Sequence, residues 1–218
     1  MSPSKIEHKL PLEVLEGLAL DQKPRIVMSE GNDPRVIAGA IAACNSGICQ
    51  IILLGSQLGI KNECKNLGLN LPIDISIINP EKSELLPEFE KEYLNIRKKK
   101  GGSIKEAQTK IKEPLIFAAL MVRLGYSTGT VGGAVETTSN VVRAAIQIIG
   151  KSDDAKLISS CFLMYPKGTF PMVFSDCGLV INPDKDELAS IAVMAAQSCK
   201  KLLQIEPIVA MLSFSTKG

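Results

Sequence analysis

Three short segments hold the residues whose types and spacing are best suited to chemistry, and all three indicate anion binding. The first, Glu30-Gly-Asn-Asp-Pro-Arg35, places an arginine in the opening turn of an expected helix. The second is Gly129-Thr-Val-Gly-Gly-Ala134, followed by Thr137-Thr-Ser-Asn140 and by Arg143. The third is the basic run Arg97-Lys-Lys-Lys-Gly-Gly102. Helix N-terminal amides and guanidinium groups bind phosphates and carboxylates, and a helical side chain such as Arg143 leans back toward the start of its helix.

Each segment also has a structural interpretation, which the local sequence leaves open. Asp33 followed by Pro34 is a good helix start without any ligand. A glycine-rich strand end followed by an exposed arginine fits the second segment equally well. For the third, a basic helix end that complements the helix dipole is preferred unless the fold places Arg97 in a cleft. Neither a Walker A loop nor a G-x-G-x-x-G fingerprint after a strand occurs.

Composition narrows the remaining chemistry. The chain has one histidine, His8, and six scattered cysteines without a C-x-x-C pair. It therefore offers almost none of the residues that a zinc site or a histidine-based catalytic triad needs. With 45% hydrophobic residues, 22% charged residues and a net charge of +2, no strong field draws the chain to nucleic acid or anionic lipid. Neither a bilayer-spanning apolar run nor a secretory signal is recognisable. We expect a cytoplasmic globular protein with reduced cysteines and no metal, which binds neither nucleic acid nor membrane.

Strand and helix patterns alternate through the first 150 residues and predict an α/β layered fold with a parallel sheet. Strands are expected at residues 25–29, 50–55, 74–79 and 130–134, and helices at residues 10–20, 34–46, 58–67, 103–112, 114–124 and 137–149, with a further helix that ends in the basic run at 97–100. After Gly150 the pattern predicts an antiparallel pair over residues 157–165 and 172–181, a helix over 183–203 and a buried strand over 208–212. We therefore expect two domains, residues 1–150 and 151–218.

The order of these segments resembles the phosphate acetyltransferase family, within the wider phosphate acetyl/butyryl transferases. The matching stretches are RIVMSEGNDPRVIAGAI with QIILLGS, YLNIRKKKGGS, VGGAVETTSNVVRAAIQII, SSCFLM with FSDCGLVINPDKDELASIA, and EPIVAMLSFSTKG. They are collinear and cover nearly the whole chain. The resemblance implies an isocitrate/isopropylmalate dehydrogenase-like fold of two layered α/β domains with a cleft between them. It also implies the interconversion of acetyl-CoA plus phosphate with acetyl phosphate plus CoA.

The same resemblance implies roles for individual residues. The family mechanism has the CoA thiolate attack the acetyl carbonyl while phosphate leaves, with CoA as a substrate and without a metal or bound cofactor. Arginine suits the phosphate because it pairs with it bidentately, which lysine does not. The residues implied are Arg97 and Arg143 as the pair that grips the phosphoryl group, with Thr137 and Thr138 close by, and, for CoA or phosphate, Arg35, Ser213, Ser215 and Thr216.

The chain departs from the family pattern in sequence and in length. Ser127-Thr128-Gly129 stands where members usually have Ala-Asp-Gly, and Glu136 stands where they usually have histidine, so a carboxylate lies beside the expected phosphate site. The chain resembles about two-thirds of a full member, with the first domain lacking its C-terminal return helices and the second incomplete. The family's catalytic aspartate and its CoA-contacting serine and arginine are expected beyond Gly218. We therefore expect no turnover from this chain alone, and a partner that is a second copy or a complementing C-terminal fragment.

Two other functions stay open. One is a non-catalytic module that binds acyl-CoA or phosphate, or an inactive remnant of the same family. Retention of Thr137, Thr138 and Arg143 favours the transferase, because a sensing module need not keep a phosphate clamp. The other is a dehydrogenase of the same fold, which is disfavoured because no paired aspartates have the spacing of a metal site.

Overall fold

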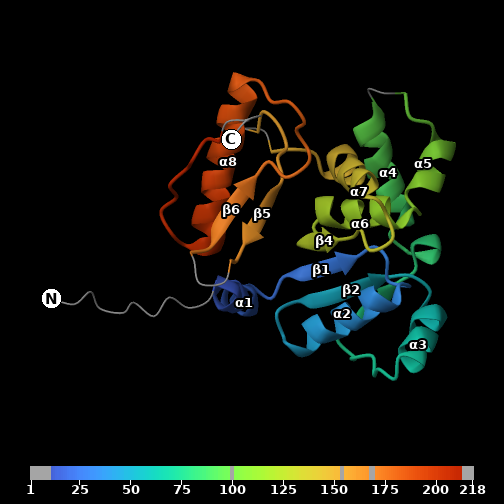
Figure 1. The fold of residues 1–218 in the computed structure, drawn as a ribbon. Helices are drawn as coiled ribbons and strands as arrows, with labels where there is room; N and C mark the ends of the chain where they lie inside the picture. Colours follow the sequence, from blue (N-terminus) through green and yellow to red (C-terminus); the bar gives the residue numbers. More distant parts are fainter. Residues whose placement is uncertain (1–10, 99–100, 153–154, 167–169, 213–218) are drawn as a thin grey trace. The chain divides into compact units, whose positions relative to one another are not determined.

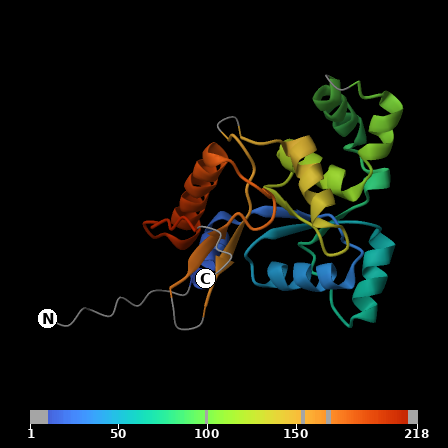
Figure 2. The same ribbon diagram turned by 45° about the horizontal axis from the view of Figure 1, so that its top comes forward.

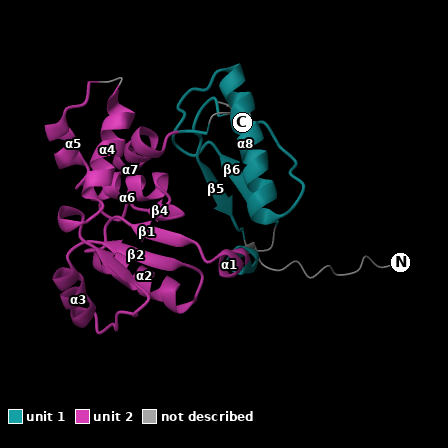
Figure 3. Ribbon diagram, turned by 180° about the vertical axis from the view of Figure 1, so that it is seen from behind, with its two compact units in different colours: residues 1–17, 151–218 teal, residues 18–150 magenta. Residues whose placement is uncertain are grey.

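The computed structural model describes residues 11–98, 101–152, 155–166 and 170–212 (Figure 1). These residues divide into two compact units, which have different colours in Figure 3. One unit consists of residues 18–150, and the other combines the chain from Lys151 onward with its beginning up to Gly17. Helix α1, Pro11–Gln22, continues across this division.

Residues 18–150 are built on a four-stranded parallel sheet in the order β3-β2-β1-β4. Its strands are β1 (Arg25–Met28), β2 (Gln50–Leu54), β3 (Ser76–Ile78) and β4 (Gly129–Val131). The predicted α/β fold with a parallel sheet is confirmed. The strand expected over residues 130–134 ends already at Val131, because the backbone N–H groups that follow bind the Glu30 side chain instead of a neighbouring strand.

Helices cover both faces of this sheet (Figure 1, Figure 2). On one face lie α2 (Pro34–Asn45) and α3 (Gln57–Asn66), and on the other lie α4 (Leu86–Arg97), α6 (Pro114–Arg123) and α7 (Thr138–Ala144). Helix α5 (Ile104–Lys110) packs against α4, a 3-10 turn covers Pro80–Lys82, and a π-helical turn, Ala145–Ile149, continues from α7.

Strand β2 divides the core between the two faces. Successive strand residues point to opposite sides of a sheet, so Ile51 and Leu53 pack with α2 and α3. Ile52 and Leu54 pack with α4 and α6 on the other side. Because helices cover both faces, β2 is apolar throughout its buried length and shows no alternation. The sheet is therefore a rigid platform whose strand ends position the loops that follow.

The second unit contains an antiparallel hairpin and a long helix, as the sequence predicts. Strand β5 (Cys161–Met164) pairs with β6 (Met172–Ser175), and α8 (Lys185–Leu203) begins with a capping box of Asp184 and Glu187. Strand β6 is shorter than predicted. The Asp176 carboxylate accepts hydrogen bonds from the backbone N–H groups of Gly178 and Leu179. These bonds turn the chain away from the sheet.

The predicted buried strand over residues 208–212 is wrong. These residues form no strand, and Ile208 and Leu212 are 99% and 90% exposed. A strand needs a neighbour to receive its backbone hydrogen bonds, and β5 and β6 pair only with each other among the strands that the structure describes. No helix in the described ranges is both long enough and apolar enough to cross a membrane.

Candidate functional site

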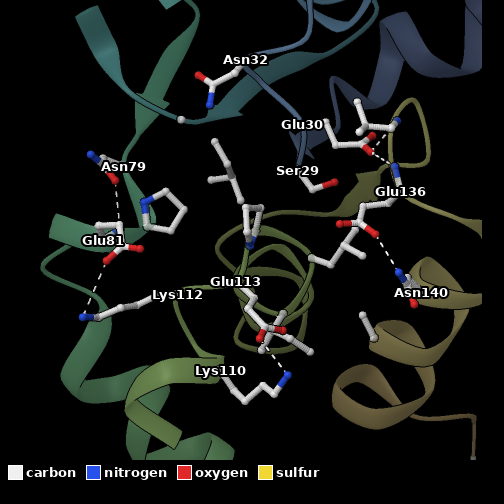
Figure 4. A pocket seen from close by; sticks show the side chains of 18 of the residues that line it. Ser29, Glu30, Asn32, Asn79, Glu81, Lys110, Lys112, Glu113, Glu136 and Asn140 are labelled. Carbon is white, nitrogen blue, oxygen red and sulfur yellow. Dashed lines mark hydrogen bonds and ion pairs between the residues drawn. The ribbon is translucent and has the colours of Figure 1, made fainter. Parts of the chain in front are cut away.

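A cavity of about 1120 Å³ lies within residues 18–150, where the four parallel strands end (Figure 4). Open α/β sheets bind ligands at the carboxyl ends of their strands, so this is where functional side chains are expected. The lining includes residues beyond every strand: Ser29 and Glu30 after β1, Gly55 and Ser56 after β2, Asn79 and Pro80 after β3, and Val135 and Glu136 in the loop after β4.

This cavity brings together Arg97 and Arg143, the two arginines expected to grip a phosphoryl group. Arg97 is the last residue of α4, and Arg143 lies in α7. The fold thus places Arg97 in a cleft, which the basic run at a helix end did not establish by itself. The other expected residues lie elsewhere: Arg35, Thr137 and Thr138 are not part of the lining, and Ser213, Ser215 and Thr216 lie outside the described residues.

The Arg97 guanidinium is partly paired and partly free. Its Nη2 lies 3.6 Å from Glu106 Oε1, and the Tyr93 hydroxyl donates to the same oxygen at 3.3 Å. Burial, and then the Glu106 carboxylate, raise the pKa of Tyr93, so this hydroxyl is a neutral donor. The Arg97 Nε–H is buried and has no hydrogen-bond partner among the described residues. A buried donor without a partner is costly, and the Arg97 side chain lines the cavity, so its guanidinium can bind an anion there.

Arg143 reaches the cavity from α7 without a carboxylate partner. None of the ion pairs among the described residues includes it. Its Nη1 donates to Asn140 Oδ1 at 3.1 Å, while Asn140 Nδ2 donates to Glu136 Oε2 at 2.8 Å. Asn140 therefore stands between the two charges, as Figure 4 shows for its bond to Glu136. The Glu136 carboxylate, which the sequence places beside the expected phosphate site, is bound to an amide, and the charge of Arg143 stays available to a ligand.

The glycine-rich loop after β4 is organised around Glu30. The Glu30 carboxylate accepts the backbone N–H groups of four consecutive residues, 133–136, at 2.7, 2.7, 2.8 and 2.6 Å. Partial burial acts to raise the pKa of Glu30, but the four donors lower it below its usual value. Gly133 has a φ of +107°, which side chains rarely permit, and this turn aims the amides at one point. The segment is an anion-binding loop whose anion comes from the chain itself.

Comparison with known proteins gives the same assignment as the sequence motifs. Residues 12–218 match the model of the Phosphate acetyl/butaryl transferase family. The chain belongs to this family. It is 38% identical over 205 residues to a phosphate acetyltransferase from Thermoanaerobacterium thermosaccharolyticum, a match that covers 92% of this chain and 62% of that protein. It is 40% identical over 213 residues to a phosphate acetyltransferase from Paracoccus denitrificans, with 95% and 63% covered.

Solved structures of phosphotransacetylases share the fold. One from Streptococcus pyogenes has a TM-score of 0.86 and 32% sequence identity, covering 100% of this chain and 64% of that chain. The EutD phosphotransacetylase from Staphylococcus aureus has a TM-score of 0.83 and 32% identity, covering 95% and 63%. The chain thus spans 62% to 64% of the length of these four relatives.

Within this member of the transferase family, Arg35 lies against the glycine-rich loop. Its Nε and Nη2 donate to the Asp33 carboxylate at 3.0 and 2.9 Å, and Nη2 also donates to the Ala134 carbonyl oxygen at 2.6 Å. Hydrogen bonds from Arg35 lower the pKa of Asp33 to about 2. The residue expected to contact CoA or phosphate here joins the loop to the start of α2.

Two lysines of the transferase-family cavity were missed by sequence reasoning. Lys110 Nζ lies 2.7 Å from Glu113 Oε1, and Lys112 Nζ lies 3.7 Å from Glu81 Oε2. Lys110 is the last residue of α5, and Lys112 lies two residues beyond it. The sequence identifies this region only as a capped helix. Ser29 was also missed, although it is 2% exposed and its hydroxyl has no hydrogen-bond partner in the part of the chain that the structure describes. The available signal was its position at the carboxyl end of the strand expected over residues 25–29.

Proposed function

We propose that this chain takes part in phosphate acetyl transfer, the interconversion of acetyl-CoA plus phosphate with acetyl phosphate plus CoA. Membership of the Phosphate acetyl/butaryl transferase family supports the proposal. The observation that carries it is the cavity that Arg97 and Arg143 share at the strand ends. The proposal includes an isocitrate/isopropylmalate dehydrogenase-like arrangement for the whole family fold, in which residues 18–150 supply the phosphate-binding part.

The two guanidinium groups would hold the phosphoryl group through the reaction. The CoA thiolate attacks the carbonyl carbon of acetyl phosphate, a carbon–sulfur bond forms, and the bond from that carbon to the phosphate oxygen breaks. The departing oxygen gains negative charge in the transition state, so fixed cations beside it lower the barrier. The Arg97 guanidinium, which lines the cavity, and the Arg143 guanidinium, which joins no ion pair among the described residues, are suited to this role. CoA is then a substrate, and no bound cofactor is needed.

Thr137 would support the site indirectly. Its hydroxyl accepts the backbone N–H of Asn140 at 3.2 Å and begins α7 as the N-cap. This fixes the helix turn from which Asn140 and Arg143 reach the cavity. Thr138 is the first residue of this helix.

The test is the transfer assay on arginine variants. Arg97→Ala and Arg143→Ala should raise the KM for phosphate or acetyl phosphate, or lower kcat, by roughly 10- to 1,000-fold, the scale of a lost charge-assisted contact. Lys98→Ala removes the neighbouring cation, which is exposed and does not line the cavity, and should keep wild-type kinetics. Arg143→Lys keeps the charge but loses bidentate pairing, and should fall between wild type and alanine.

The assay is run with this chain alone and with a second polypeptide that supplies the rest of the Paracoccus denitrificans relative, of which this chain covers 63%. Acetyl-CoA formation is followed from CoA and acetyl phosphate. Turnover that both alanine substitutions leave unchanged, in either arm, would contradict the proposed phosphate clamp. Saturable phosphate binding without turnover in both arms would favour a non-catalytic binding module.

A further inference from the structure

The Glu30 carboxylate fills a site that is built to bind an anion. One of its oxygens accepts the first two N–H groups of residues 133–136, and the other accepts the last two. Successive backbone N–H groups that converge on one point form an anion-binding concavity. While Glu30 occupies it, these amides are not available to a phosphate. The loop therefore contributes to the cavity through its shape and its side chains.

A continuous series of hydrogen bonds leads from this loop to Arg143. The backbone N–H of Glu136 is bound to Glu30, and its side chain accepts from Asn140 Nδ2 at 2.8 Å. Asn140 Oδ1 accepts in turn from Arg143 Nη1 at 3.1 Å. Arg35 holds the same loop from the other side, through the Ala134 carbonyl oxygen at 2.6 Å. The direction of the Arg143 guanidinium thus depends on where the loop is held.

We propose that Glu30 is a positioning residue of the phosphate site, which acts on the ligand only through the loop, Glu136, Asn140 and Arg143. The part that concerns phosphate rests on the proposed function. Glu30 lies in the series SEGNDPR that follows β1, and the loop follows β4, the strand beside it in the sheet. The parallel sheet therefore brings the two together although they are far apart in the sequence.

Glu30→Gln is the informative substitution because it keeps size and shape. A glutamine side chain has one accepting oxygen and an NH₂ group that cannot accept, so two of the four backbone N–H groups lose their partner. Glu30→Asp keeps the charge on a shorter side chain and replaces the glutamine variant if that variant does not fold. Glu84→Gln is the matched control, since Glu84 is exposed and does not line the cavity.

The first measurement is hydrogen exchange of the amides of residues 133–136 in the full chain. In the wild type and in Glu84→Gln these amides should be protected. In Glu30→Gln their exchange should accelerate, while the amides of β2 stay protected. Unchanged exchange at all four amides would overturn the assignment of Glu30, and this readout does not depend on the proposed function.

The second measurement is a titration with inorganic phosphate. Arg143→Ala should weaken phosphate binding by about tenfold or more, and Glu30→Gln by roughly three- to tenfold, because a displaced arginine keeps part of its contact. The double variant should bind no more weakly than Arg143→Ala alone, since Glu30 acts through that residue. Fully additive losses would overturn the positioning role. An unchanged phosphate affinity in Arg143→Ala would overturn both the proposed phosphate contact of Arg143 and the positioning role of Glu30. The exchange data would then show only whether Glu30 binds the amides of residues 133–136.

Chemical rescue provides a third measurement. Glu30→Ala leaves the four amides open, and sodium formate, a small carboxylate, should occupy them and restore both amide protection and phosphate affinity. Sodium chloride at equal ionic strength should not, and formate should not improve the wild type. A merely structural role for the Glu30 side chain predicts no rescue of phosphate affinity by formate, and that outcome would overturn the proposal.

Discussion

Residues 18–150 bury many of their large apolar side chains, whereas residues 151–212 leave most of theirs exposed. The first region buries them on both faces of its sheet, and Phe117 of α6 is fully buried. In the second region, Ile191 and Leu203 are the only buried apolar side chains among the described residues, while Phe162 and Phe174 of the hairpin are 60% and 51% exposed. Helices on both faces of a parallel sheet close a core, whereas one hairpin and one helix provide too few layers to do so.

The two regions also contain different cavities. The lining of the cavity in the first region includes three ion pairs, which join Arg97 to Glu106, Lys110 to Glu113 and Lys112 to Glu81. The second region has a cavity of about 840 Å³, lined mainly by apolar side chains of β6, α8 and residues 205–212. Among the described residues, the cavity suited to an anion thus lies in the region with the larger buried core. The second region buries few apolar side chains, so we expect polar contacts to contribute more of its stability.

The largest expected difference between the regions is in the cost of truncating a phenylalanine. Phe117→Ala should lower the free energy of unfolding by about 3–5 kcal/mol, because it leaves a cavity in a close-packed core. Phe174→Ala, at a side chain that is already half exposed, should cost less than about 1 kcal/mol. Denaturant titration of both variants checks this. Equal costs would contradict the contrast in burial.

Asp176 tests whether polar contacts order the second region. Burial acts to raise the pKa of its carboxyl, but hydrogen bonds from the backbone of Leu179, Gly178 and Ser160 and from the Ser159 hydroxyl lower it strongly. Asp176→Ala should cost about 1–3 kcal/mol, since it removes both acceptor oxygens and leaves part-buried donors without a partner. The amides of Gly178 and Leu179 should lose protection from hydrogen exchange. If they remain protected, the turn does not depend on this carboxylate.

A smaller effect is expected at the start of α7 in the first region. Thr137→Ala removes the N-cap acceptor of the Asn140 N–H and should cost about 0.5–2 kcal/mol. Ser139→Ala is the matched control, because Ser139 lies two residues after Thr137 and is exposed. It should change stability by no more than a few tenths of a kcal/mol. Thermal unfolding of the two variants measures the difference. Equal shifts in Tm would contradict the capping role.

The smallest expected effect is an acid sensitivity of the pair between Asp33 and Arg35, because the Arg35 side chain is 68% exposed and solvent screens its charge. The pKa of Asp33 is lowered from 3.8 to about 2, mainly by hydrogen bonding from Arg35. Its stabilising contribution should be present above about pH 4 and lost as the pH falls toward 2. Asp33→Asn should flatten this part of the stability profile, measured by unfolding between pH 5 and pH 2. A profile with the same slope in both proteins would exclude the pair as its source.

The parallel sheet and most helices could be predicted because their signals are local. The run QIILL, the cap at Asp33 and the proline at position 34 each specify structure within a few residues. The loop after β4 could not be predicted, since its shape depends on Glu30, which comes from a distant part of the sequence. Residues 208–212 have the composition of a strand, but strand formation requires a neighbour, which no local pattern encodes.

The candidate site divides in the same way. Anion binding was indicated by residue type, but placing Arg97 in the cavity depended on the family resemblance, because its local sequence equally fits a solvated helix end. In the structure, Arg97 and Tyr93 of α4 both contact Glu106 of α5, and no spacing rule predicts these contacts between two helices. The hydrogen bond from Arg35 to the Ala134 carbonyl oxygen could not be predicted either, because it joins two loops that only the folded sheet brings together.

A crystal structure of the chain grown or soaked with inorganic phosphate shows whether Arg97 and Arg143 hold a phosphoryl group. We predict a phosphate in the cavity of residues 18–150, with oxygens about 2.7–3.2 Å from the Arg97 and Arg143 guanidinium groups, and with Glu30 still bound to residues 133–136. A phosphate bound to those four amides with Glu30 displaced, or a cavity without phosphate at saturating concentration, would rule out this arrangement.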